Sequence, residues 1–184
     1  MLFYQFNNTN RTNQNTGNIV KLKPRHFFYA ILVSTIGSQS IAAERGPVTN
    51  LLMPRYVSLK ATEANARRGP SLSHRIDWIF KKKGMPLEIY GEYDNWRRVR
   101  DAEGAGGWIH YSLLSGVRSI VVTSSMANLH RKSNKNSMVL ARIEENYIAD
   151  LGKCVKDWCE IDAGKYDGWV KKIDVWGVAP NEVR

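Results

Sequence analysis

GWIH at residues 107–110 and GWVK at residues 168–171 decide the fold, because both stretches belong to one internal repeat. Two further pairs of similar segments precede them in the same order. ANAR (64–67) corresponds to ANLH (127–130), and DNW (94–96) corresponds to KDW (156–158). The offsets between the copies are 63, 62 and 61 residues. Self-similarity at a nearly constant period indicates duplicated structural units. We therefore predict two tandem units, residues 56–116 and 117–180.

The apolar segments within each unit are short and interrupted, which is typical of strands and not of helices. The strands expected in the first unit are 56–60, 78–82, 87–93, 96–100 and 107–110, and those in the second are 119–123, 139–143, 147–151, 158–161 and 168–170. Asp94-Asn95 suits a tight turn, since both residue types tolerate positive φ. The predicted fold is all-β, with at most a 3₁₀ turn near 111–114. A unit of this size buries only about 60% of its unfolded surface, so we expect the two units to pack on each other.

The first 43 residues differ from the rest in both charge and pattern. The chain of 184 residues has a net charge of +10, but residues 1–43 hold four cations and no acid, and the remaining 23 basic and 17 acidic side chains give +6. Cationic residues directly precede the apolar stretch 27–37, which is the layout of a secretory signal peptide. We predict a signal peptide with an upstream extension, cleaved after Ala42 or Ala43, and a periplasmic or secreted protein. No stable membrane insertion is expected after cleavage, because the apolar stretch is too short to span a bilayer.

The first unit resembles the bacterial Src-homology-3-like (SH3b) family. The residues that carry the resemblance are NARRGP (65–70), the Asp-Asn-Trp turn before RRV (97–99), and GWI (107–109) followed by LL (113–114). The similarity covers residues 56–180 but is weaker in the second unit, where Lys132-Ser133 replaces Gly-Pro and His130 replaces Arg67. The resemblance implies two tandem five-stranded small barrels of a kind that usually binds rather than catalyses, often within cell-envelope proteins.

Strand alternation predicts which aromatic side chains face outward. An inward Val99 turns Trp96 outward beside Arg98, and an inward Ile109 turns its two neighbours outward. The second unit repeats this pattern. By resemblance, Trp96, Trp108, His110 and Leu113 would occupy the peptide groove of the eukaryotic relatives. The candidate ligand-binding residues are Trp96, Arg98, Trp108, His110, Leu113, Trp158 and Trp169.

Two functional hypotheses follow. The first is a binding module that recognises a peptide or a cell-wall (peptidoglycan) component through an aromatic barrel face. The alternative is an envelope scaffold or protein-interaction protein whose tryptophan faces are buried between the barrels. Trp176 has no aromatic counterpart in the first unit, and we interpret it as packing between the units. Export argues against nucleic acid as a partner. The basic cluster of Lys81-Lys82-Lys83 with Arg67-Arg68 and Arg97-Arg98 is either an anion patch or a solvated strand end.

Cys154 and Cys159 flank a short connection between two expected strands, so an exported protein would form a hairpin disulfide there. A structural zinc site would need about four ligands, and only His130 is available nearby. No nucleophile or metalloprotease motif occurs in the chain. We therefore expect no enzymatic activity, no metal and no cofactor.

Overall fold

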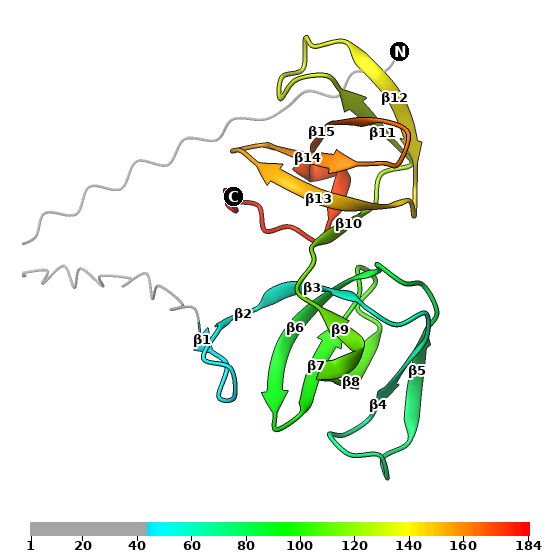
Figure 1. The fold of residues 1–184 in the computed structure, drawn as a ribbon, viewed down its shortest axis with the longest axis vertical. Coiled ribbons are helices and arrows are strands. Elements are labelled where there is room, and N and C mark those ends of the chain that lie inside the picture. The colour runs from blue at the N-terminus through cyan, green and yellow to red at the C-terminus, as the bar shows by residue number, and fades with distance from the viewer. Residues whose placement is uncertain (1–43) are drawn as a thin grey trace, which may run out of the picture. The chain divides into compact units, whose positions relative to one another are not determined.

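The computed structural model describes residues 44–184, and Figure 1 shows their fold. The expected signal peptide and its cleavage sites lie outside the described residues. The described part confirms the all-β prediction, because its only helical elements are two short 3₁₀ turns. Within residues 44–184, none of the helical elements has the length and apolarity needed to cross a membrane.

Each repeat forms one antiparallel seven-stranded sheet. The first sheet has the order β5-β4-β8-β7-β6-β3-β9, and its elements are β3 (Arg55–Leu59), β4 (Ala64–Arg67), β5 (Ile76–Phe80), β6 (Pro86–Tyr93), β7 (Trp96–Arg100), β8 (Gly106–His110), η1 (Tyr111–Leu113) and β9 (Leu114–Ser115). The second has the order β12-β11-β15-β14-β13-β10-β16, and its elements are β10 (Ser119–Val122), β11 (Met126–His130), β12 (Val139–Glu144), β13 (Ile148–Cys154), β14 (Trp158–Asp162), β15 (Asp167–Lys171), η2 (Lys172–Asp174) and β16 (Val175–Trp176). The two orders correspond strand for strand.

All of the predicted strands are present, with ends displaced by up to three residues. Each sheet holds seven strands where five were expected. The additional strands β4 and β11 have alternating burial, but in β4 the inward positions are Ala64 and Ala66, and alanine is a weak strand signal. The other additions, β9 and β16, are only two residues long. The tight turn at Asp94-Asn95 is confirmed, with Asp94 at φ +45° and Tyr93 paired with Trp96.

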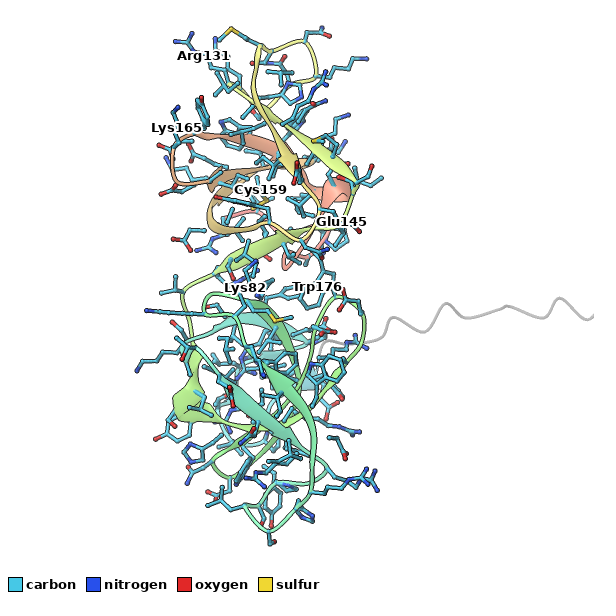
Figure 2. The ribbon with its side chains drawn as sticks, turned by 90° about the vertical axis from the view of Figure 1, so that its right-hand side faces the viewer. Lys82, Arg131, Glu145, Cys159, Lys165 and Trp176 are labelled. Atoms are coloured by element: carbon cyan, nitrogen blue, oxygen red, sulfur yellow. A yellow bond between two sulfur atoms is a disulfide. The ribbon has the colours of Figure 1, made fainter. Side chains whose placement is uncertain are left out.

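Each barrel has a core of its own. The inward residues predicted from alternation are buried, and these include Val99 and Ile109 in the first barrel and Cys159, Ile161 and Val170 in the second. The disulfide between Cys154 and Cys159 is confirmed and joins β13 to β14 (Cys159 is labelled in Figure 2). Closing so short a loop stabilises the folded state by about 2 kcal/mol in the chain-entropy treatment.

A single residue pair joins the hairpin of β4 and β5, and likewise that of β11 and β12, to the rest of its sheet. Arg67 pairs with Trp108 between β4 and β8, and His130 pairs with Trp169 between β11 and β15. At Gly107 a Cβ atom would lie 2.6 Å from the carbonyl oxygen of Arg67, and φ is +153°. A Cβ at Gly168 would lie 2.7 Å from the carbonyl oxygen of His130. The glycine of the repeated Gly-Trp pair is therefore required by the close approach of two backbones.

Residues 44–53 form a small hairpin of β1 (Glu44–Arg45) and β2 (Leu52–Met53), which the predicted boundary at residue 56 leaves out. The buried carboxylate of Glu92 holds this hairpin to the first barrel. It accepts hydrogen bonds from the Thr49 hydroxyl at 2.7 Å, the Thr49 N–H at 2.9 Å and Arg55 Nη2 at 2.6 Å. Burial alone would raise the pKa of Glu92, but the hydrogen bonds from Thr49, Arg55 and Val48 outweigh it and lower the pKa to about 2.

Contacts also join the two barrels. The rings of Tyr56 and Trp176 meet edge to face with their centroids 5.1 Å apart, as expected for a Trp176 that packs between the units. The Ser119 hydroxyl donates to the carbonyl oxygen of Gly84 at 2.6 Å. These contacts agree with barrels that pack on each other.

We predict that Gly107→Ala lowers the free energy of unfolding by about 3 kcal/mol, through the clash with the Arg67 carbonyl and the unfavourable φ. The measurement is urea unfolding followed by tryptophan fluorescence. Gly116→Ala is the matched control, because a Cβ at Gly116 would meet no atom within 4 Å. A Gly107→Ala protein as stable as this control would contradict the proposed constraint.

The second prediction concerns acid. The pKa of Glu92 is about 2 in the folded protein against an ordinary value of 4.5. The carboxylate therefore contributes its full stability above pH 4.5, and this contribution is lost as the pH falls toward 2. Glu92→Gln should lower the free energy of unfolding at pH 7 by about 2 kcal/mol, and should flatten its pH dependence between 4.5 and 2. The exposed Glu103, changed to Gln, is the control; equal acid sensitivity in both variants would refute the assignment.

Candidate functional site

Trp96 and Trp158 occupy equivalent places, since each is the first residue of the strand after a tight connection. Each ring meets a histidine edge to face: Trp96 meets His110 with centroids 5.6 Å apart, and Trp158 meets His130 at 5.0 Å. The two tryptophans are 9% and 8% exposed. Their histidine partners belong to the same barrel, so each ring packs within its own barrel and shows only part of itself to a ligand.

In the first barrel, three of the predicted site residues come together. Trp96, His110 and Leu113 line a shallow pocket of about 180 Å³. Arg67 and Leu72 complete much of its wall. The His110 ring nitrogen Nδ1 lies 2.8 Å from the Ser112 hydroxyl, which helps to fix the ring orientation.

Arg67 holds the loop between β4 and β5 beside this pocket. Its Nη1 donates to the carbonyl oxygens of Leu72 at 2.9 Å and His74 at 2.7 Å. In the second barrel His130 replaces Arg67, and its Nδ1 donates to the carbonyl oxygen of Ser137 at 3.0 Å. Because Ser137 follows His74 by the repeat offset of 63 residues, the histidine preserves one of the two loop contacts. This explains why the second copy tolerates the departure from the arginine of the motif.

The remaining predicted site residues lie elsewhere. Arg98 pairs with Trp108 across β7 and β8, and its guanidinium lies 5.1 Å from the centroid of the Tyr90 ring. Neither Arg98 nor Trp108 lines the pocket beside Trp96. Trp169 is paired with Glu160 of β14 and does not line the second-barrel cavity described next. The predicted set is thus divided among separate surfaces.

A larger cavity, about 890 Å³ in volume, lies beside Trp158 of the second barrel, and Tyr56 of the first barrel forms part of its lining. Trp158, Ile173 and Trp176 provide apolar surface, and Ile173 is 85% exposed. Trp176, labelled in Figure 2, also makes the contact with Tyr56 of the first barrel. We call this hollow the Trp158 cavity.

Four lysines line the Trp158 cavity. Lys172 is buried and donates to the carbonyl oxygens of Pro180 and Glu182, whereas Lys135, Lys156 and Lys171 are exposed. Lys171 Nζ lies 5.8 Å from the centroid of the Trp158 ring, a cation–π arrangement. None of the ion pairs within residues 44–184 involves these lysines, and Asp157 is the acidic residue in the lining. The sequence did not predict these lysines as site residues. Lys171 could have been found, because it corresponds to the predicted site residue His110 at the repeat offset of 61 residues.

Neither pocket has the residues of a metal centre. Across residues 44–184, no group of three or more His, Cys, Asp and Glu side chains is arranged to hold a metal ion. The chemistry that the two pockets offer is aromatic stacking, apolar contact and, in the Trp158 cavity, attraction of anionic groups.

Comparison with known proteins identifies both repeats. The family profile described as bacterial SH3 domain matches residues 60–116 and 123–177. Among solved structures, the chain is similar to NlpC2 and NlpC1 from Trichomonas vaginalis, each with 14% sequence identity and a TM-score of 0.32. The matches cover 67% and 76% of this chain, and 48% and 50% of those two chains, so the chain spans about half their length. Comparison with curated proteins gives no significant match.

We predict that Arg67→Ala loosens the loop of residues 68–75, whose amides should then exchange with solvent about tenfold faster. Arg67→His should retain most of the protection, because His130 makes the corresponding contact in the second barrel. Hydrogen exchange followed by NMR measures both variants. Arg98→Ala is the control, since Arg98 is exposed and does not contact the loop carbonyls. Unchanged exchange in Arg67→Ala would refute this role.

Proposed function

The chain belongs to the bacterial SH3 domain family, whose domains are binding modules, and we propose that it is a non-catalytic exported protein that binds a peptide-bearing cell-wall component. The single observation that carries the proposal is the Trp158 cavity, which combines aromatic surface with three exposed lysines that make no ion pair in the described part. The predicted signal peptide supports a periplasmic or secreted location, where such a component is accessible.

The properties of the Trp158 cavity favour a ligand with both apolar groups and carboxylates. A volume of about 890 Å³ lies in the usual range for a small-molecule or short-peptide site. Trp158 and Trp176 offer ring faces for an alkyl chain or a sugar, and the lysines attract carboxylates. Peptidoglycan fragments carry sugars, small apolar side chains and carboxylates together. The pocket beside Trp96, at about 180 Å³, supports at most an accessory contact.

The scaffold alternative has less support. It places the tryptophan faces of Trp96 and Trp108 between the barrels, whereas Trp96 packs against His110 of its own barrel. The aromatic rings that meet between the barrels are those of Tyr56 and Trp176. Trp158 lines the cavity and is not part of this contact, so the binding hypothesis is favoured.

Titration of the full chain with soluble peptidoglycan fragments, followed by tryptophan fluorescence, tests the proposal. The double variant Lys156→Glu/Lys171→Glu should weaken binding at least about tenfold, because it reverses two charges beside Trp158. Both lysines are exposed, so the variant is expected to fold.

Lys153→Glu is the matched control, since Lys153 is exposed on β13 and does not line the cavity. It should bind within about twofold of the unmodified protein, because distant surface charges are screened by salt. Equal affinity of the double variant and the control would exclude the Trp158 cavity as the site. An absence of binding to any fragment by the unmodified protein would overturn the proposed ligand class.

A further inference from the structure

Strand β5 lies at the edge of the first sheet and pairs only with β4 (Figure 1). Its outer side therefore carries backbone N–H and C=O groups that have no neighbouring strand. Residues 76–79 are all exposed, and the apolar residues Ile76, Trp78 and Ile79 are 40%, 48% and 42% exposed. Proteins ordinarily protect such an edge, because a flat apolar edge pairs with other chains.

The second repeat shows that the fold does not require a tryptophan at position 78. Trp78 is opposite Ala66 in the first barrel, and Ala141 is opposite Leu129 at the same place in the second. The core residues Phe80 and Ile143 confirm this register, because each lies opposite the first alanine of its repeat motif. A barrel of the same topology thus forms with alanine where β5 exposes a tryptophan, so Trp78 serves something other than barrel closure.

The charges beside β5 are also specific to this repeat. Lys81, Lys82 and Lys83 follow the strand directly, and no acidic side chain in the described part lies within 4.0 Å of their amino groups. The acid of the strand, Asp77, is held by Arg75 at 2.7 Å and Arg68 at 3.1 Å and is thereby satisfied. In the second repeat, Glu144 and Glu145 stand where Lys81 and Lys82 stand in the first.

We propose that β5 is a docking strand for an acidic, extended segment of another protein, which adds to the sheet beside Trp78. Backbone hydrogen bonds to the open edge would supply affinity, and the exposed side chain of Trp78 would pack on the added strand. The acidic residues of that segment would lie next to Lys81 and Lys83. This surface is distinct from the Trp158 cavity, and the proposal goes beyond the proposed function.

Charge disfavours the two occupants that this chain itself offers. Residues 1–43 contain no aspartate or glutamate, so they cannot complement the lysines. A second copy of β5, paired antiparallel about Trp78, would place Arg75 directly opposite Lys81 at both ends of the pair. Parallel pairing would place the lysine runs side by side. Like charges opposite each other destabilise paired strands, so the occupant is a different, acidic chain.

The experiment adds peptides to the isotopically labelled full chain and follows the β5 amides by NMR. The test peptide begins with glutamates and continues with alternating valine and threonine. A peptide with the same charges but a central proline, which cannot continue a strand ladder, is the control. We expect the first peptide to shift and protect the amides of residues 76–80, and the proline peptide to bind at least about tenfold more weakly.

Two variants separate the contributions to binding. Trp78→Ala copies the residue of the second repeat and is expected to fold, and it should weaken peptide binding about tenfold. Lys81→Glu/Lys83→Glu should weaken it by a similar factor, and it leaves intact the bond from Lys82, labelled in Figure 2, to the Asn146 carbonyl. Lys153→Glu again serves as the charge control.

Several results would overturn the proposal. They are the absence of protection at residues 76–80 with the acidic peptide, and equal binding of the proline peptide. Two further results would assign the surface to another occupant. If phosphatidylglycerol vesicles bind the protein through Trp78 and the peptide does not, the edge is a membrane contact. If sedimentation shows self-association that Trp78→Ala abolishes, the occupant is a second copy.

Discussion

The close approach of two backbones, Gly107 to the carbonyl of Arg67 and Gly168 to that of His130, is the constraint on which both barrels depend. It lets β8 of the first unit pair with β4, and β15 of the second unit pair with β11. Each sheet is thereby continuous from one end to the other. Within the first sheet, the ring of Trp96 meets His110 because β7 and β8 are paired in that register. The place of the Trp96 pocket therefore follows from strand pairing.

The same constraint explains how much could be predicted from the sequence. Glycine next to an aromatic residue, repeated at a near-constant offset, indicated the repeat, and alternation about Val99 and Ile109 indicated the inward face. The strand at Ala64–Arg67 could not be recognised, because its inward alanines give little periodic signal. Arg98 and Trp108 do not line the Trp96 pocket, and Arg98 lies over Tyr90 instead. Such contacts between strands cannot be predicted from the spacing of residues along one strand. The lysines beside Trp158 come from separate loops and strands and meet only in the folded barrel.

Duplication has preserved the topology while the surfaces of the two barrels have diverged. The first barrel keeps a small pocket beside Trp96 and an apolar, basic edge at β5, whereas the second has the large Trp158 cavity and an acidic end at its edge strand β12. Such divergence is possible because the residues that differ, such as Trp78 and the lysines of the two surfaces, are not core residues. Ala141 and Trp78 occupy equivalent positions in the strand pairing, and the fold does not require the same residue at both. Two surfaces of different chemistry thus occupy one duplicated scaffold.

Stability comes from different added contacts in the two barrels, as small domains with limited cores require. In the first barrel, the buried Glu92 carboxylate fixes the hairpin of residues 44–53. In the second, the Cys154–Cys159 disulfide covalently closes the loop between two strands. The Tyr56–Trp176 contact adds apolar burial that both barrels share. None of these contacts uses β5 or the lysines of the Trp158 cavity. Because the fold is stabilised elsewhere, an exposed tryptophan and unpaired lysines can persist on these two surfaces.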